Sequence, residues 1–353
     1  MKLEKPGQGR LKFASQDHPP VASSKIGVLI ANLGTPDNTD YWSMRRYLSE
    51  FLSDKRVIDY PKWLWQPLLQ FIILSKRPFS SGEAYKSIWN EANDESPLLT
   101  ISKGQLEKLN QYFAQDHFEG KIILDLCMRY GNPSTEKAIR GLQKLGCEKI
   151  LFFPLYPQYA GPTTATANDQ AFRILMKMNW QPAIRTVPAY FDKPIYIKAL
   201  ATSIKEAYAK ENNKPEHLVV SYHGVPERYL LSGDPYHCQC QKTTRLLANE
   251  LQWDNGYCTT TFQSKFGPEK WVGPSTVDYV AELARKGKKN IAIVAPAFSS
   301  DCVETLEEIN QEIAESFMEA GGEKFLYIPC LNDRDDHIKA LIQIIENELA
   351  GWI

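Results

Sequence analysis

Short runs of β-branched and aromatic residues alternate along the chain with longer amphipathic segments. The runs have the length of strands and are nearly continuously apolar, and they lie at 25–32, 121–128, 149–154, 217–223, 257–263, 290–296 and 324–329. Helical spacing of apolar residues is found between them, at 135–145, 194–210, 276–285 and 303–318. Near-continuous apolar strands separated by helices are typical of parallel sheets that are covered on both faces. The pattern therefore predicts an α/β fold.

An internal repeat divides this pattern into two halves. The letters PST open one expected helix at 133–135 and another at 274–276, an offset of 141 (274 − 133). Earlier in each half, NLGTP at 32–36 resembles YHGVP at 222–226, at an offset of 190 (224 − 34). We infer two similar halves, the first with about 49 additional residues (190 − 141) between these landmarks. Chance similarity is the alternative, because βα units share prolines and glycines for local reasons.

The repeat gives Leu33 and His223 equivalent places, each just past the carboxyl end of an expected strand. Open α/β sheets bind ligands outside those carboxyl ends. His223 is therefore a candidate site residue, although a strand-end histidine can also be held by the neighbouring backbone alone. Neither glycine-rich turn fits GxGxxG or GxxxxGK[ST], so the sequence does not favour a dinucleotide or P-loop site.

Composition and charge narrow the class further. The chain has 353 residues, enough for two domains, with 41 Lys+Arg against 42 Asp+Glu and a formal net charge of −1. This balance gives no electrostatic reason to expect a nucleic-acid partner. The first residues lack the apolar core of a signal peptide, and seven scattered cysteines favour a reducing, cytoplasmic setting over a disulfide framework. No apolar run has the length that a membrane span requires.

A second candidate pair follows the strand at 290–296. Asp301 and Glu304 are three residues apart, so on a helix they share a face. The same spacing fits a capping box, in which Glu304 only satisfies a backbone donor. Combined with His223, these carboxylates would offer one nitrogen and one or two oxygens to a divalent transition metal. Two protein ligands make an open site, which suits the transfer of a metal more than its storage.

Several long motifs, in the same order, resemble the ferrochelatase family over most of the chain, from about Lys25 to the last strand and helix. They are NLGTP, SEFLSDKRVIDYP, ESPLL, MRYGNPS, FPLYPQYAGPTTAT, SYHGVPERYLLSGDPYHCQCQKT, TFQSKFGPEKWVGPST and PAFSSDCVETLEEI. The resemblance implies two Rossmann-like domains with a porphyrin cleft between them. It also implies insertion of Fe²⁺ into protoporphyrin IX, with the iron as substrate and no tightly bound cofactor.

Site residues carry over from the family position by position. His223 matches the catalytic histidine, Glu304 the essential glutamate and Asp301 a supporting acid, with His223 and Glu304 as metal contacts. The positions that match porphyrin-lining residues are Leu33, Tyr85, Arg129, Tyr130 and Trp271. The chemistry suits these types, because both pyrrole protons must leave as the metal enters and a neutral imidazole accepts a proton near neutral pH. Apolar walls that bend the macrocycle would assist insertion through ground-state strain.

An aromatic segment at 60–75 falls within the additional residues of the first half. We expect it to form a lip, either holding a flat apolar substrate or touching a bilayer as a peripheral contact, and the alternative is an ordinary buried helix. The apolar candidates are Trp63, Leu64, Trp65, Leu68, Leu69, Phe71, Ile72 and Ile73. Cys238, Cys240 and Cys258 raise the alternative of a [2Fe–2S] cluster, but their spacing fits no standard pattern and no cysteine follows Cys330.

The expected organisation is an arm at 1–24, a first domain at 25–175, a second domain with the metal site at 176–330, and a C-terminal helix at 331–353 that packs back on the first domain. The alternative functions are a chelatase for coproporphyrin or Co²⁺, a non-catalytic tetrapyrrole carrier, and an iron–sulfur redox protein. The sequence leaves the oligomeric state open.

Overall fold

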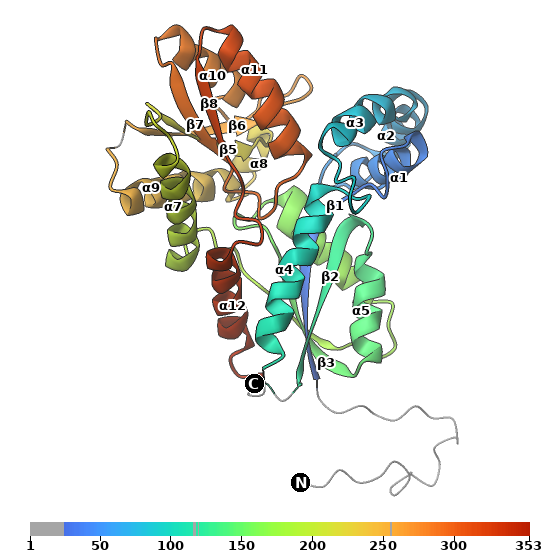
Figure 1. Ribbon diagram of the computed structural model, residues 1–353. Coiled ribbons are helices and arrows are strands. Elements are labelled where there is room, and N and C mark those ends of the chain that lie inside the picture. Colours follow the sequence, from blue (N-terminus) through green and yellow to red (C-terminus); the bar gives the residue numbers. More distant parts are fainter. Residues whose placement is uncertain (1–24, 116–117, 119, 255) are drawn as a thin grey trace, which may run out of the picture.

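The computed structural model describes residues 25–353 except 116, 117, 119 and 255, so the arm expected at 1–24 lies outside the described residues. Figure 1 shows two sheet-containing units, with helices packed around each. In the first sheet the strands are β1 (Lys25–Thr35), β2 (Ile122–Gly131), β3 (Cys147–Pro154) and β4 (Ala183–Thr186). In the second they are β5 (Leu218–His223), β6 (Cys258–Gln263), β7 (Asn290–Val294) and β8 (Lys324–Ile328).

Both sheets are parallel and have the same topology. The strand orders are β2-β1-β3-β4 and β6-β5-β7-β8, so each strand of the first sheet has a counterpart at the same place in the second. The prediction of two parallel, helix-flanked units is therefore confirmed. The shared topology also supports the internal repeat over chance similarity, because related halves must share strand order and chance does not require it.

The described helical segments cover these sheets and link their strands. Their bounds are α1 (Tyr41–Leu52), α2 (Lys62–Leu68), η1 (Leu69–Ile73), α3 (Leu74–Ile88), α4 (Pro97–Phe113), α5 (Thr135–Lys144), η3 (Gly161–Ala165), α6 (Thr166–Leu175), α7 (Pro194–Ala209), α8 (Glu227–Leu231), α9 (Tyr236–Leu251), α10 (Thr276–Arg285), η4 (Glu304–Ile313), α11 (Ala314–Glu319) and α12 (Asp335–Leu349). The three η segments are π-helical, and π-helical turns inside helices are frequent at functional sites.

The first sheet is buried on both faces, as the continuous apolar runs predict. Val28 and Ile30 of β1 pack in one core, whereas Leu29 and Ala31 pack in another on the opposite face. Successive side chains of a strand point to opposite faces, so a strand between two helical layers must be apolar throughout. Truncation of such a residue to alanine typically costs about 2–5 kcal/mol.

The additional residues of the first half lie between β1 and β2, where α1 to α4 take the place that α8 and α9 have in the second half. Helices α1, α2 and α3 gather beside the first unit, at the upper right of Figure 1. Asp40 caps α1 by accepting from the backbone nitrogens of Trp42 and Ser43. Ser96 caps α4 by accepting from the backbone nitrogen of Leu99, with Pro97 at the first helical position.

The first sheet extends past residue 175, where the sequence places the boundary between the domains. Residues Ala183–Thr186 form β4, which pairs with β3 and so belongs to the first sheet. This edge strand is short and only partly buried, so it carries no apolar run that the sequence pattern could reveal. Helix α12 lies beside α4 in Figure 1, and Tyr112 of α4 donates to Glu346 of α12 at 2.7 Å.

Candidate active site

A cavity of about 460 Å³, here called the central cavity, lies where the two halves face each other. This volume is in the range of small-molecule sites. Its walls contain five of the residues that the sequence singles out: Leu33, Tyr85, His223, Trp271 and Glu304. Asp301, Arg129 and Tyr130 are not among its lining residues.

His223 is the last residue of β5, at the carboxyl end of the second sheet. Its Nδ1 lies 2.7 Å from the carbonyl oxygen of Gly224. A carbonyl oxygen only accepts hydrogen bonds, so Nδ1 carries the proton and Nε2 of the neutral ring has a free lone pair. The neighbouring backbone thus holds His223, as expected for a strand-end histidine, through Nδ1 alone. Nε2 remains available as a base, and His223 lines the cavity.

Glu304 is the first residue of η4, a segment with π-helical bonding over Glu304–Ile313. The i→i+5 bonding of a π-helix places more than four residues in each turn, so side chains four apart stay near one line. Glu304, Glu308 and Glu312 have this spacing, and all three line the cavity. Glu307 lines the cavity as well. These three further glutamates were not among the predicted site residues, although the spacing of glutamates in ETLEEINQE indicates them.

Glu308 is held at the wall between β6 and η4. Its carboxylate accepts from the backbone nitrogen and the hydroxyl of Ser264, each at 2.6 Å, and from Nε2 of Gln263 at 3.1 Å. Burial raises the pKa of Glu308, although these hydrogen bonds and the nearby His223 act in the opposite direction. A carboxyl group with a raised pKa exchanges protons closer to neutral pH, which is a property of proton-transfer groups.

Asp301 lies behind the cavity wall and is 5% exposed. Its Oδ1 accepts from the Tyr327 hydroxyl, from the Thr305 hydroxyl at 3.1 Å and from the Cys330 backbone nitrogen at 3.2 Å. Its Oδ2 accepts from Nδ2 of Asn332 at 2.7 Å. These bonds occupy the carboxylate with structural partners. Asp301 therefore supports the loop that precedes η4 and does not reach the cavity.

The capping-box alternative for Asp301 and Glu304 does not describe this helix start. The backbone nitrogen of Cys302 donates to Oγ1 of Thr305 at 2.9 Å, so a threonine supplies the reciprocal bond. No side-chain cap is present at the N-terminus of η4. The Glu304 side chain is instead part of the cavity wall.

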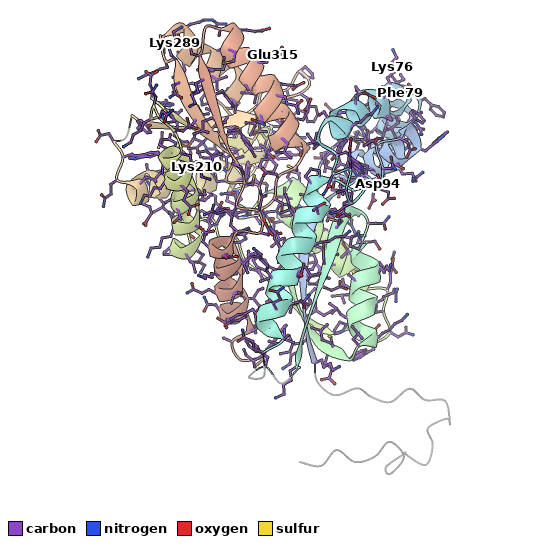
Figure 2. All side chains as sticks on the ribbon, viewed as in Figure 1. Lys76, Phe79, Asp94, Lys210, Lys289 and Glu315 are labelled. Atoms are coloured by element: carbon purple, nitrogen blue, oxygen red, sulfur yellow. The ribbon has the colours of Figure 1, made fainter. Side chains whose placement is uncertain are left out.

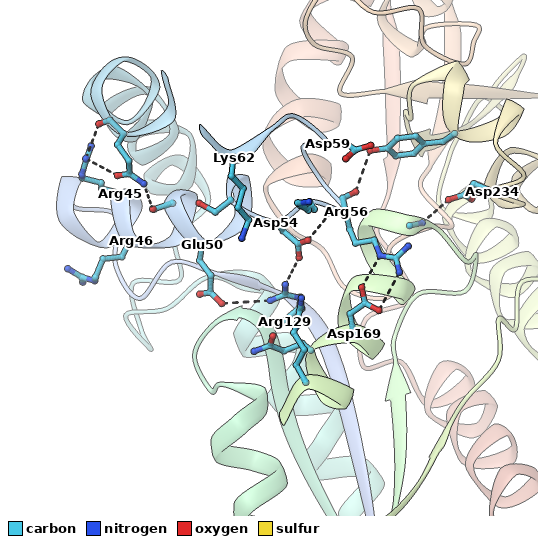
Figure 3. Close-up of a pocket in the computed structure, with 18 of the residues that line it drawn as sticks. Arg45, Arg46, Glu50, Asp54, Arg56, Asp59, Lys62, Arg129, Asp169 and Asp234 are labelled. Carbon is cyan, nitrogen blue, oxygen red and sulfur yellow. Dashed lines mark hydrogen bonds and ion pairs between the residues drawn. The ribbon is translucent and has the colours of Figure 1, made fainter. Parts of the chain in front are cut away.

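Arg129 and Tyr130 lie outside the central cavity. Arg129 lines a second, larger opening of about 1240 Å³, here called the polar cleft. Figure 3 shows Arg129 pointing toward Asp54 and Glu50, and it forms ion pairs with both. The buried Tyr130 donates to Asp54 at 2.9 Å. A buried guanidinium needs a carboxylate partner, so Arg129 is held toward Asp54 and does not line the central cavity. Its contact with a porphyrin stays a prediction. In the same cleft Arg56 pairs with Asp169.

Two phenols stand near Glu304. Tyr47 and Tyr85 are buried, and burial raises the pKa of each phenol, with the charge of Glu304 adding to the effect. Both phenols therefore stay protonated at neutral pH. Tyr47 donates to the carbonyl of Gly34 at 3.2 Å, which fixes its ring at the edge of the cavity.

The aromatic segment forms α2, η1 and the start of α3, and most of its apolar side chains face outward. Trp63 is 79% and Phe71 80% exposed, and Leu64, Leu68 and Ile72 are exposed as well. Figure 2 shows Lys76 and Phe79 at the outer edge of the same helical cluster. Leu69 is buried, and half-buried Trp65 donates to the carbonyl of Leu52 at 2.7 Å. The segment therefore presents an exposed apolar face, which the buried-helix alternative does not explain. The lip remains a prediction.

No cluster of three or more histidine, cysteine, aspartate or glutamate side chains suited to a metal ion is present within the part of the chain that the structure describes. All seven cysteines are free thiols, of which Cys238 is exposed and Cys240 is buried. In the described residues, no helix combines the length and the apolar character needed to cross a bilayer.

Solved structures with the same architecture define the class of fold. SirB from Bacillus subtilis with Fe³⁺ matches with a TM-score of 0.55 and 13% identity, over 93% of this chain and 96% of that chain. The sirohydrochlorin chelatase SirB from Bacillus subtilis subspecies spizizenii in complex with cobalt matches with a TM-score of 0.54 and 11% identity, over the same shares. At these identities the likeness concerns the fold alone. The chain therefore has the two-unit chelatase fold.

Sequence comparison then gives the family. The ferrochelatase family model matches residues 25–349. A ferrochelatase of Rhodobacter capsulatus is 62% identical over 97% of this chain and 98% of its own length. One of Allorhizobium ampelinum is 52% identical over 96% of this chain and 97% of its own length. The chain belongs to the ferrochelatase family.

Proposed function

We propose that the chain inserts Fe²⁺ into protoporphyrin IX in the central cavity to form protohaem. The observation that carries this proposal is that His223 and Glu304 line one cavity, together with the apolar and aromatic side chains of Leu33 and Trp271. Family membership gives the reaction class, and the cavity supplies a basic nitrogen, carboxylates and an apolar surface for a flat ring.

The reaction releases two protons for each metal ion that enters the ring. His223 accepts a pyrrole proton at Nε2, because Nδ1 is already protonated and bound to Gly224. Glu304 assists by contacting the metal or by receiving a proton, with Glu308 next along the same line of carboxylates. Nε2 of His223 has one lone pair, so with Glu304 it would hold Fe²⁺ weakly first and accept the pyrrole proton only after the metal has passed into the ring.

The cationic side chains of the cavity favour protoporphyrin over coproporphyrin. Arg77 and Lys265 are the arginine and lysine among the lining residues. Protoporphyrin IX carries two propionates and coproporphyrin carries four, so two cations match the first substrate in number. An anaerobic insertion assay with each porphyrin and Fe²⁺ tests this: higher kcat/KM with protoporphyrin is expected, and a clear preference for coproporphyrin would overturn the assignment.

Glu304→Gln tests the site itself. Glutamine has the shape of glutamate but neither binds Fe²⁺ as an anion nor takes up a proton at neutral pH, so we expect kcat to fall by about 10²–10⁴-fold. His223→Ala is expected to abolish insertion while porphyrin binding, followed by fluorescence quenching, persists. Glu315→Gln is a matched control on the exposed side of α11, since Glu315 does not line the cavity. Wild-type kcat in Glu304→Gln would refute the proposed role of this carboxylate.

We also propose that the enzyme works in the cytoplasm as a peripheral membrane protein, with the lip as its contact. Exposed Trp63 and Phe71 support this, because tryptophan and phenylalanine on the apolar face of a surface helix insert into the headgroup region. The free thiols suit a reducing compartment.

A further inference from the structure

Gln263, the last residue of β6, contacts the elements that carry His223 and Glu304, the proposed catalytic pair. It pairs across the sheet with His223, and its backbone oxygen accepts from the nitrogen of Gly224 at 2.8 Å. Its side-chain nitrogen donates to the carbonyl oxygen of Glu304 at 2.7 Å and to the carboxylate of Glu308 at 3.1 Å. One amide therefore connects the strand end that carries His223 with the helix that carries the carboxylates.

The two bonds of this amide fix how η4 is turned about its own axis. They reach the first residue of the π-helical segment and the residue four positions later, so both anchors lie on the side of η4 that faces β6. The two bonds from Ser264 hold η4 at Glu308 alone, and a helix held at one point can still rotate. The Gln263 amide adds the carbonyl of Glu304, and two anchors on one side determine which side chains face the cavity. Glu304, Glu308 and Glu312 line the cavity in this orientation.

The orientation of the Gln263 amide is itself determined. The hydroxyl of Ser221 on β5 donates to Oε1 at 2.7 Å, and this oxygen must therefore point toward β5. The opposite orientation would set Oε1 against the carbonyl of Glu304 and the carboxylate of Glu308, with no hydrogen between them. Gln263 is 3% exposed, so solvent does not compete for these bonds.

The first half contains a counterpart of this arrangement. Asn32 pairs with Met128 and Gly34 with Tyr130, so Leu33 stands opposite Arg129 as His223 stands opposite Gln263.

The bridges agree with this equivalence, because Met128 pairs with Ser134 in the first half and Phe262 with Ser275 in the second. Nε of Arg129 donates to the carbonyl of Thr166 at 3.1 Å, directly after the π-helical segment η3. In both halves the end of the second strand thus anchors the helix that follows the third strand.

We propose that Gln263 is a positioning residue for metal insertion, which sets the rotation of η4 and thereby presents the row of glutamates to the substrate opposite His223. The inference rests on the proposed function, because it concerns the efficiency of that reaction. Gln263 itself does not line the central cavity, so it acts through Glu304 and Glu308.

Gln263→Leu removes the amide that donates both hydrogen bonds. Leucine has a similar volume and, like glutamine, is not branched at Cβ. A displacement of the reacting groups by about 1 Å costs up to about 10²-fold in rate, so we expect kcat to fall by about 10–100-fold. KM for porphyrin is expected to stay within about threefold, since the apolar walls are untouched. A crystal structure of the variant is expected to show η4 rotated or rebonded in the α pattern.

Gln181→Leu is the matched control. Gln181 donates the same kind of bond to the carbonyl of Leu175 at 2.8 Å, and neither residue lines the central cavity or the polar cleft. Its kcat should equal that of the wild type. If Gln263→Leu retains kcat within twofold, or if its loss appears in the porphyrin KM with kcat unchanged, the positioning role is wrong.

Ser221→Ala tests the same chain of bonds from its other end if Gln263→Leu fails to fold. It removes the donor to Oε1 and so weakens the hold on the amide without changing any side chain of the cavity. We expect a kcat at least threefold below the wild type, and an unchanged kcat would overturn the inference. An inactive wild-type enzyme would instead contradict the proposed function, and the two failures are therefore distinguishable.

Discussion

Asp301→Asn separates a structural from a chemical role for the acid three residues before Glu304. The carboxylate of Asp301 accepts from the Thr305 and Tyr327 hydroxyls, the Cys330 backbone nitrogen and the amide of Asn332. Asparagine keeps one acceptor oxygen for the first three donors. Its new amide group then faces the amide of Asn332, where two donors meet and neither has an acceptor.

The cost follows from these four bonds. Losing the bond from Asn332 to a charged acceptor costs about 1.5–3 kcal/mol, and three bonds that become neutral lose roughly 0.5 kcal/mol each. The sum is about 4 kcal/mol. For 353 residues that unfold together, an unfolding entropy of roughly 0.7 kcal/mol/K converts this into a decrease in Tm of about 5 °C.

Differential scanning calorimetry and an insertion assay on the folded fraction give the two readouts. Asp335→Asn serves as the control, because Asp335 is an exposed partner of Lys108 and its loss should leave Tm within about a degree. We expect Asp301→Asn to lower Tm and to retain most of its activity well below the transition. A variant with unchanged Tm and no insertion would refute this reasoning and make Asp301 a participant in the chemistry.

Three further outcomes follow from the structure. His337 is 1% exposed, and burial lowers its pKa to about 4, so its ring stays neutral in the native state while the unfolded state gains a proton below about pH 6.5. The free energy of unfolding therefore falls by about 2 kcal/mol between pH 6.5 and pH 5. His337→Gln should flatten the dependence of Tm on pH over this range. Gly34 has φ +119, and a Cβ there would lie 1.8 Å from the carbonyl oxygen of Tyr130. Gly34→Ala should therefore lower Tm by more than 3 °C in a thermal melt. An unchanged Tm would show that the strand end adapts to the added methyl group. Replacing Trp63 and Phe71 together by serine should reduce sedimentation with anionic vesicles at least tenfold at unchanged Tm, whereas equal sedimentation would exclude the lip as the contact.

The sequence predicted the fold well where burial dictates the pattern. Strands such as β1 and β3 are buried on both faces, so their apolar character runs through consecutive residues, at 28–31 and 150–153. β4 was missed because a short edge strand with partly exposed residues has no such requirement. Leu33 was expected just past a strand, but β1 continues to Thr35 through backbone pairing with β2, which residue type does not signal.

At the site, sequence reasoning reached side chains that touch the cavity more reliably than those that support it. His223 and Glu304 both line the central cavity. Arg129 was expected there but turns toward Asp54, because the nearest carboxylate decides where a buried guanidinium points, and that carboxylate is distant in sequence. Gln263 was missed for the same reason: its partners Ser221 and Glu304 come from other strands and helices.

The equivalence of Leu33 and His223 makes the cavity chemically two-sided. The imidazole and every carboxylate of its lining come from the second half, whereas the first half supplies Leu33 and the cation Arg77. A flat ring in this cavity would therefore meet the imidazole and the carboxylates from one side only. Leu33→His would place imidazoles at both related positions. Comparing the turnover of this variant with that of the native protein would show whether metal insertion depends on having the imidazole on one side only.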